Sequence, residues 1–136
     1  MPELDELIKI THESTELWES GQPQKAFKLL DDAIAEAIRA NRSNWVRTLA
    51  LHAAVLSDFM GDLRLARRYR EDCLSQDPDD PMALYGLAKV LSRQGEADLA
   101  KEYATKAYKL FMQRGTELDH AMLEGIMKHW PDLPRG

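Results

Sequence analysis

The sequence has little that would hold a chain together covalently or place it in a membrane. Its 136 residues include one cysteine, Cys73, so no disulfide can form within the chain. No apolar run approaches the roughly 20 residues that a membrane-spanning helix needs. The N-terminus (residues 1–5) has neither the basic start nor the apolar stretch of a signal peptide. These absences predict a soluble, cytoplasmic protein. Because Cys73 falls at a small-residue position, we expect it to be a buried thiol.

The motifs that mark common catalytic sites are also missing. There is no glycine-rich phosphate loop, no pair of cysteines and no His-Glu-x-x-His pattern. A serine or cysteine nucleophile would need a histidine and a carboxylate that the fold brings together, and no local pattern indicates such an arrangement. We therefore expect no enzymatic activity, no cofactor and no metal site.

The composition is that of a globular domain with an acidic surface. Hydrophobic residues make up 44% of the chain, the formal net charge is −5 and the pI is about 5.4. An acidic surface repels phosphate backbones, so we expect no nucleic acid partner. The arginines between Arg64 and Arg70 are interpreted as the solvated face of a helix.

The clearest pattern lies in residues 81–110. Apolar and small side chains recur at helical spacing on both sides of Gly95, which predicts two amphipathic helices joined by a glycine turn. Pro81 suits a first helical turn, and Asp79 or Asp80 can cap it. The predicted buried faces comprise Leu84, Leu87, Ala88 and Leu91 before the glycine, and Ala100, Tyr103, Ala104 and Ala107 after it.

The same pattern occurs twice more in the sequence. Counting back 34 residues from Gly95 gives Gly61, and a further 40 residues gives Gly21. Small residues keep their places after each glycine, with Ala26, Ala66 and Ala100 equivalent, and likewise Ala33, Cys73 and Ala107. A helix–turn–helix repeated at this period is typical of a solenoid. Over about residues 7 to 112, this small-residue spacing resembles the tetratricopeptide repeat (TPR) family.

The resemblance implies an all-α fold, a right-handed superhelix of about seven helices. We predict one domain over residues 1–130, with repeats at 7–46, 47–80 and 81–114 and a capping helix at 116–129. The other expected helices span 3–20, 23–40, 45–60 and 63–76, with two more around Gly95, and Ser43 or Asn44 is the expected N-cap of the third. Counting on 34 residues from Leu84, Leu87 and Ala88 predicts that Leu118, Ala121 and Met122 face the core. The prolines of the tail, residues 131–136, predict partial disorder there.

In this family the first helix of each repeat lines a concave groove that binds another chain. Several residues that the resemblance places there are apolar, which suggests a peptide or helix of a partner as the ligand. The alternative is that these side chains contact the next repeat or lie under the tail. The expected groove residues are Ile8, Thr11, His12, Thr15, Trp18, Thr48, Leu51, His52, Val55, Phe59, Met82, Tyr85, Gly86, Lys89 and Arg93, with Leu123, Ile126 and Met127 continuing the wall.

The histidines of the predicted groove form a pattern of their own. His12, His52 and His120 occupy the same repeat position, where imidazoles could bind metal or respond to pH. Equivalent positions in stacked helices lie roughly 10 Å apart, which argues against one shared ion and favours polar contacts along the groove.

The resemblance suggests a non-catalytic protein-interaction module and excludes one specialised type. Family members that clamp the carboxylates of chaperone tails use fixed positive charges at groove positions that are Thr11, Thr15, His52, Met82 and Gly86 here. Two alternatives stay open. Three repeats in a small acidic chain also resemble chaperones of secreted translocator proteins, and a homodimer could form through Trp18, Trp45, Trp130 and Phe59.

Overall fold

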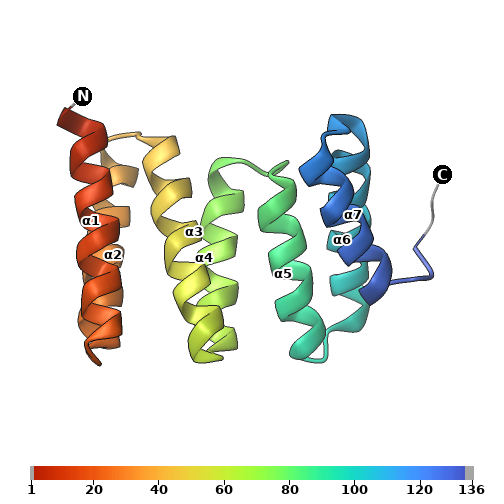
Figure 1. Cartoon of the computed structure of the whole chain (residues 1–136), viewed down its shortest axis with the longest axis horizontal. Helices are drawn as coiled ribbons and strands as arrows, with labels where there is room; N and C mark the ends of the chain where they lie inside the picture. Colours follow the sequence, from red (N-terminus) through yellow and green to blue (C-terminus); the bar gives the residue numbers. More distant parts are fainter. Residues whose placement is uncertain (1, 134–136) are drawn as a thin grey trace. The chain divides into compact units, whose positions relative to one another are not determined.

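A computed structural model describes residues 2–133 of the chain, which contain seven α-helices and no β-strand (Figure 1). This confirms the all-α prediction and the number of helices. No helix in the described range is long and apolar enough to cross a membrane. The helices are α1 (Pro2–Glu19), α2 (Pro23–Arg39), α3 (Ser43–Met60), α4 (Leu63–Gln76), α5 (Pro81–Arg93), α6 (Ala97–Arg114) and α7 (Glu117–His129).

The chain divides between Gln76 and Asp77 into two compact units. Unit 1 contains α1 to α4, and unit 2 contains α5 to α7. The predicted extent of a single domain, residues 1–130, stays a prediction.

The three glycines expected at helix ends adopt the same bend. Gly21, Gly61 and Gly95 have φ values of +84°, +73° and +85°, in the left-handed region that favours glycine. In each bend the amide that follows the glycine donates a hydrogen bond to a carbonyl five residues earlier, which closes the last helical turn. These bonds are Gln22 N to Leu17 O (2.8 Å), Asp62 N to Ser57 O (3.0 Å) and Glu96 N to Leu91 O (2.9 Å).

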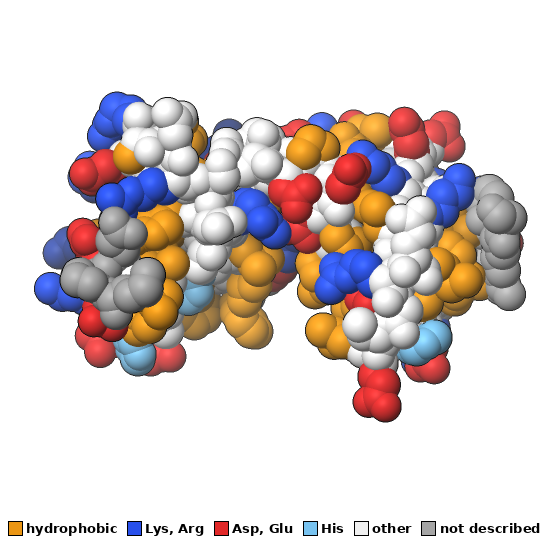
Figure 2. Space-filling view, turned by 90° about the horizontal axis from the view of Figure 1, so that it is seen from above, with side chains coloured by type: hydrophobic (Ala, Val, Ile, Leu, Met, Phe, Trp, Pro, Cys, Tyr) orange, Lys and Arg blue, Asp and Glu red, His pale blue; other side chains and the backbone are white. Residues whose placement is uncertain are grey.

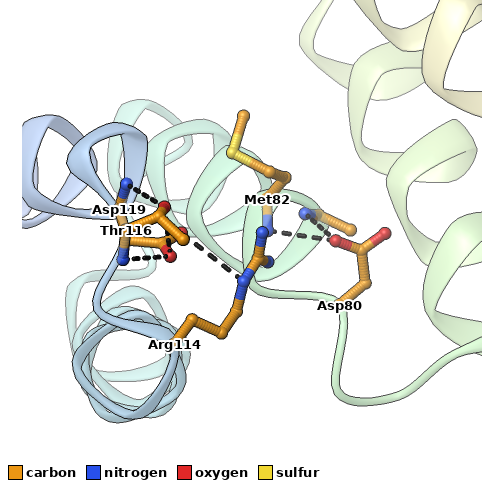
Figure 3. Close-up of polar contacts among 6 residues, drawn as sticks. Asp80, Met82, Arg114, Thr116 and Asp119 are labelled. Carbon is orange, nitrogen blue, oxygen red and sulfur yellow. Dashed lines mark hydrogen bonds and ion pairs between the residues drawn. The ribbon is translucent and has the colours of Figure 1, made fainter.

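The helix starts expected at Pro23 and Pro81 agree with the sequence, whereas the start of α3 differs. Pro23 and Pro81 begin α2 and α5, and the Asp80 carboxylate accepts hydrogen bonds from the amides of Met82 (3.1 Å) and Ala83 (3.3 Å; Figure 3). The expected cap of α3 was wrong. Ser43 is already helical, and the N-cap is Arg42, whose side chain makes no capping bond.

Small side chains and a polar cluster join the two hairpins of unit 1. Ala26 and Ala66 are fully or almost fully buried, as expected for helices that approach closely. Tyr69 of α4 stacks on Phe27 of α2, and its hydroxyl donates to the Asp31 carboxylate at 2.7 Å. The pKa of Tyr69 is raised, first by burial and then by this bond. Cys73 is buried, as predicted.

In unit 2, α7 packs with a different face from the one predicted. Leu118 is 61% exposed and Ala121 is exposed, whereas Asp119, Leu123 and Ile126 are buried. The start of α7 is fixed by a capping box, in which the Asp119 amide donates to Thr116 Oγ1 (3.2 Å) and the Thr116 amide donates to Asp119 Oδ2 (3.1 Å; Figure 3). The Thr116 hydroxyl also donates to Asp119 Oδ2 (2.6 Å). Because Asp119 is fixed inward, the face predicted by counting repeats turns away from the core.

The chain after α7 is folded as far as Leu133. Leu133 is buried, and the Trp130 ring meets the Tyr85 ring edge-on, with centroids 6.5 Å apart. Pro131 and Asp132 are exposed, and the partial disorder of the tail stays a prediction. Residues 134–136 lie outside the described residues.

Candidate functional site

Unit 1 contains a hollow of about 530 Å³ between α1 and α3. Residues one turn apart on each helix form its walls, because side chains three or four residues apart share a helix face. On the face of unit 1 visible in Figure 2, histidine side chains lie beside hydrophobic ones. Every residue lining the hollow belongs to the set expected to form a groove. They are Thr11, His12, Thr15, Thr48, Leu51, His52 and Val55.

One hydrogen bond crosses the hollow and joins Thr15 to His52. The Thr15 Oγ1 atom lies 3.0 Å from His52 Nε2 and 2.9 Å from the Thr11 carbonyl oxygen. The ring of His52 therefore links the two walls of the hollow.

The environment of His52 favours the neutral imidazole. Burial lowers the pKa of His52 below the ordinary value of 6.5, and interaction with the backbone of Thr11 opposes this in part. At neutral pH the hollow therefore presents aliphatic groups, hydroxyls and a neutral imidazole from His52.

Beyond the hollow, the surface becomes more apolar. One turn past Thr15 and Val55, the rings of Trp18 and Phe59 contact each other with centroids 6.1 Å apart, and Phe59 is 74% exposed. At the other end of the set, Ile8 is also exposed. Unit 1 thus brings together all of the predicted groove residues that lie on α1 and α3.

Only some of the groove residues predicted on unit 2 are exposed. Met82, Lys89 and Arg93 are exposed on α5, whereas Tyr85 is 8% exposed and Gly86 is buried. Tyr85 lies against α7, where a Cβ built on Gly125 would be 2.5 Å from its hydroxyl oxygen. The expectation that Tyr85 faces a ligand was therefore wrong, because α7 and Trp130 lie against its side chain, and Gly86 is not exposed to a ligand either. Lys89 places its ammonium 4.5 Å from the centre of the Tyr85 ring.

The expected extension of the groove along α7 is also corrected. Leu123 and Ile126 are buried in the packing of unit 2, and Met127 is half-buried. His120 lines a separate hollow of about 490 Å³ with Tyr108, Glu124 and Lys128 among its neighbours. His12 and His52 share the hollow of unit 1, and no group of three metal-binding side chains occurs among the described residues.

The aromatic residues expected to form a homodimer face have partners within the chain. Trp18 contacts Phe59, Trp130 contacts Tyr85, and the guanidinium of Arg42 lies 4.9 Å from the centre of the Trp45 ring. Phe59 is the most exposed of these side chains. The homodimer stays a prediction.

Sequence reasoning missed one feature beside the hollow. No role was predicted for the carboxylates of α1, but Asp5, Glu16 and Glu19 are exposed on a single stripe with His12, which lines the hollow. Their helical spacing was visible in the sequence and could have identified this stripe.

Helical hairpins with equivalent glycine bends, and a hollow between two first helices, define an all-helical repeat protein with a candidate binding surface. No protein-family model matches the chain. The chain is similar to part of the cellulose synthase operon protein C of Pseudomonas fluorescens (strain SBW25), with 29% identity over 121 residues. That match covers 87% of this chain and 8% of the length of the Pseudomonas protein.

Proposed function

We propose that this chain is a non-catalytic interaction module that binds a peptide or helix of a partner protein in the hollow between α1 and α3. One observation carries the proposal: all seven residues that line the hollow were expected, from the repeat resemblance alone, to face a ligand. The hollow is open to solvent and has a volume of about 530 Å³.

The exposed apolar side chains support a protein ligand. Leu51 and Val55 are 40% and 39% exposed, so neither is fully used in packing the helices of unit 1. Apolar side chains on a hollow surface favour a partner that inserts apolar groups of its own, as an amphipathic helix or extended segment does. The similarity to a small part of a much longer protein also suits a modular role.

The proposal is tested by capture from an extract of the native cells, using the intact chain and two variants. Leu51→Asp with Val55→Asp places charge in the hollow and should abolish capture of a specific partner. The matched control is Met112→Asp with Ile38→Asp, which changes two other exposed apolar residues, on α6 and α2, by the same chemistry. Circular dichroism checks that both variants keep their helices. Capture that survives Leu51→Asp with Val55→Asp would show that the hollow is not the binding site.

A further inference from the structure

An acidic edge runs along α1 beside the hollow. Asp5, Glu16 and Glu19 are exposed, and together with His12 they recur at spacings of seven, four and three residues, which places them on one stripe of the helix. Figure 2 shows acidic side chains on both sides of a histidine at the edge of unit 1. Since His12 itself lines the hollow, this stripe forms the lip of the hollow on the α1 side.

Little positive charge offsets this edge. Between Pro2 and Glu19 the sequence contains one lysine, Lys9, whose ammonium lies 3.9 Å from the Glu13 carboxylate. On the opposite wall, α3 contains one base, the half-buried Arg47, and Arg42 precedes the helix with its guanidinium over the Trp45 ring. Lys25 and Arg64 belong to α2 and α4, which lie behind α1 and α3 (Figure 1). The lip is therefore negative where a ligand would approach.

The hollow itself differs from its lip, because none of the seven lining residues is an acid, a lysine or an arginine. An apolar side chain of a ligand can enter without separating a buried ion pair, while the charges of the ligand remain at the edge. At the end of the hollow, the exposed ring of Phe59 and its neighbour Trp18 add aromatic faces, which attract cations.

We propose that the partner segment is basic: it places an apolar side chain in the hollow and sets lysine or arginine side chains against Asp5, Glu16, Glu19 and the Trp18–Phe59 pair. The inference rests on the proposed function and names the chemistry of its ligand. An acidic segment would meet like charges along the whole α1 lip. A second copy of this chain carries a net charge of −5 and the same acidic edge, so charge disfavours self-association there.

The experiment selects ligands from a phage-displayed library of random peptides of roughly 16 residues, long enough for four helical turns. The intact chain should enrich peptides with lysine or arginine near large apolar residues. A synthetic peptide of the selected sequence should bind more weakly as salt is raised. Its affinity should fall about fivefold for each of the changes Glu16→Lys and Glu19→Lys at low salt.

A matched control separates a local effect from the effect of net charge. Glu102→Lys with Glu117→Lys changes the net charge by the same amount on exposed positions of unit 2, and should leave the selected sequences and their affinity nearly unchanged. Equal losses in this control and in the double variant Glu16→Lys with Glu19→Lys, or selected peptides without a basic bias, would overturn the inference while leaving the proposed function in place.

Two further outcomes have separate meanings. Peptide binding that survives Leu51→Asp with Val55→Asp, or the milder Leu51→Ser, would remove the proposed function itself. Sedimentation of the chain alone provides the last arm: a dimer that dissociates on Leu51→Ser would show that the hollow holds a second copy, which would overturn the inference.

Discussion

At the scale of single residues, the approach of α5 to α7 depends on a glycine. A Cβ on Gly125 would meet the Tyr85 hydroxyl oxygen at 2.5 Å, but the next ring atom, the Cζ carbon, at 3.4 Å, an ordinary contact distance. The hydroxyl alone therefore makes the site too small for alanine. Burial also raises the pKa of Tyr85, as expected for a phenol covered by a helix.

This geometry predicts that Gly125→Ala has opposite effects on stability in the natural sequence and in the Tyr85→Phe variant. In the natural sequence, Gly125→Ala should destabilise the protein, because overpacking costs about 1–3 kcal/mol and outweighs the gain in helix propensity of about 1 kcal/mol. In the Tyr85→Phe background, the same change should stabilise it by up to about 1 kcal/mol. Denaturant unfolding of the four variants measures both values. Destabilisation of equal size in both backgrounds would contradict the contact.

His52 predicts how stability depends on pH. Because burial lowers its pKa below the ordinary 6.5, the folded state resists protonation, and the unfolded state takes up the proton first. The contribution of neutral His52 to the free energy of unfolding is fully present above pH 6.5. This contribution is lost as pH falls from 6.5 toward the lowered pKa of the folded state. His52→Gln should lose less stability than the natural protein between pH 7.5 and pH 5. Equal losses of stability in the two proteins would show that the pKa of His52 is not lowered in the folded state.

At the scale of elements, the glycine bends decide where one helix ends and its partner begins. No atom lies within 4 Å of a Cβ built on Gly61 or Gly95, so there is space for a side chain, and the positive φ is the obstacle. Gly61→Ala and Gly95→Ala should each cost about 1–2 kcal/mol, and asparagine at either position should cost less. Thermal melts of the four variants measure this. If alanine replaced either glycine with no loss of stability, these bends would not be left-handed.

The capping box should decide how firmly α7 covers Tyr85. Thr116→Ala removes the hydroxyl that bonds Asp119, and loss of such a cap costs about 1 kcal/mol. The hydrogen bond from Thr116, aided by Arg114, holds the pKa of Asp119 below its usual range. The stabilisation is therefore present above the ordinary carboxyl pKa and is lost as pH falls through the lowered pKa. The stability difference between the natural protein and Thr116→Ala, measured by denaturant unfolding, should shrink at acidic pH. A constant difference would exclude an ionised Asp119 from the cap.

The helices could be predicted where residues close in the sequence determine their ends and their packed faces. The glycines, the prolines and the small residues such as Ala26 and Ala66 specified the hairpins and the faces that pack. The face of α7 could not be predicted by counting, because it depends on the inward Asp119 and on the space that Gly125 leaves for Tyr85. The residues of the hollow followed from the repeat register, but the acidic lip required knowing which edge of α1 borders the hollow.

At the scale of the whole molecule, the division into two units predicts independent folding of the first. Unit 1 buries Leu30, Val46 and Leu49 between its own helices. A fragment ending at Gln76 should therefore be helical and melt cooperatively, although a chain of this size is only marginally stable. Circular dichroism with temperature tests this. A fragment that is unfolded at room temperature would show that unit 1 needs unit 2.

The central claim, that the hollow between α1 and α3 holds a partner, is tested most directly by amide NMR of the intact chain. The measurement is a titration with a peptide selected from the displayed library. The largest shift changes should fall on residues 11–18 of α1 and 48–59 of α3. Changes confined to unit 2, or to α2 and α4, would contradict it.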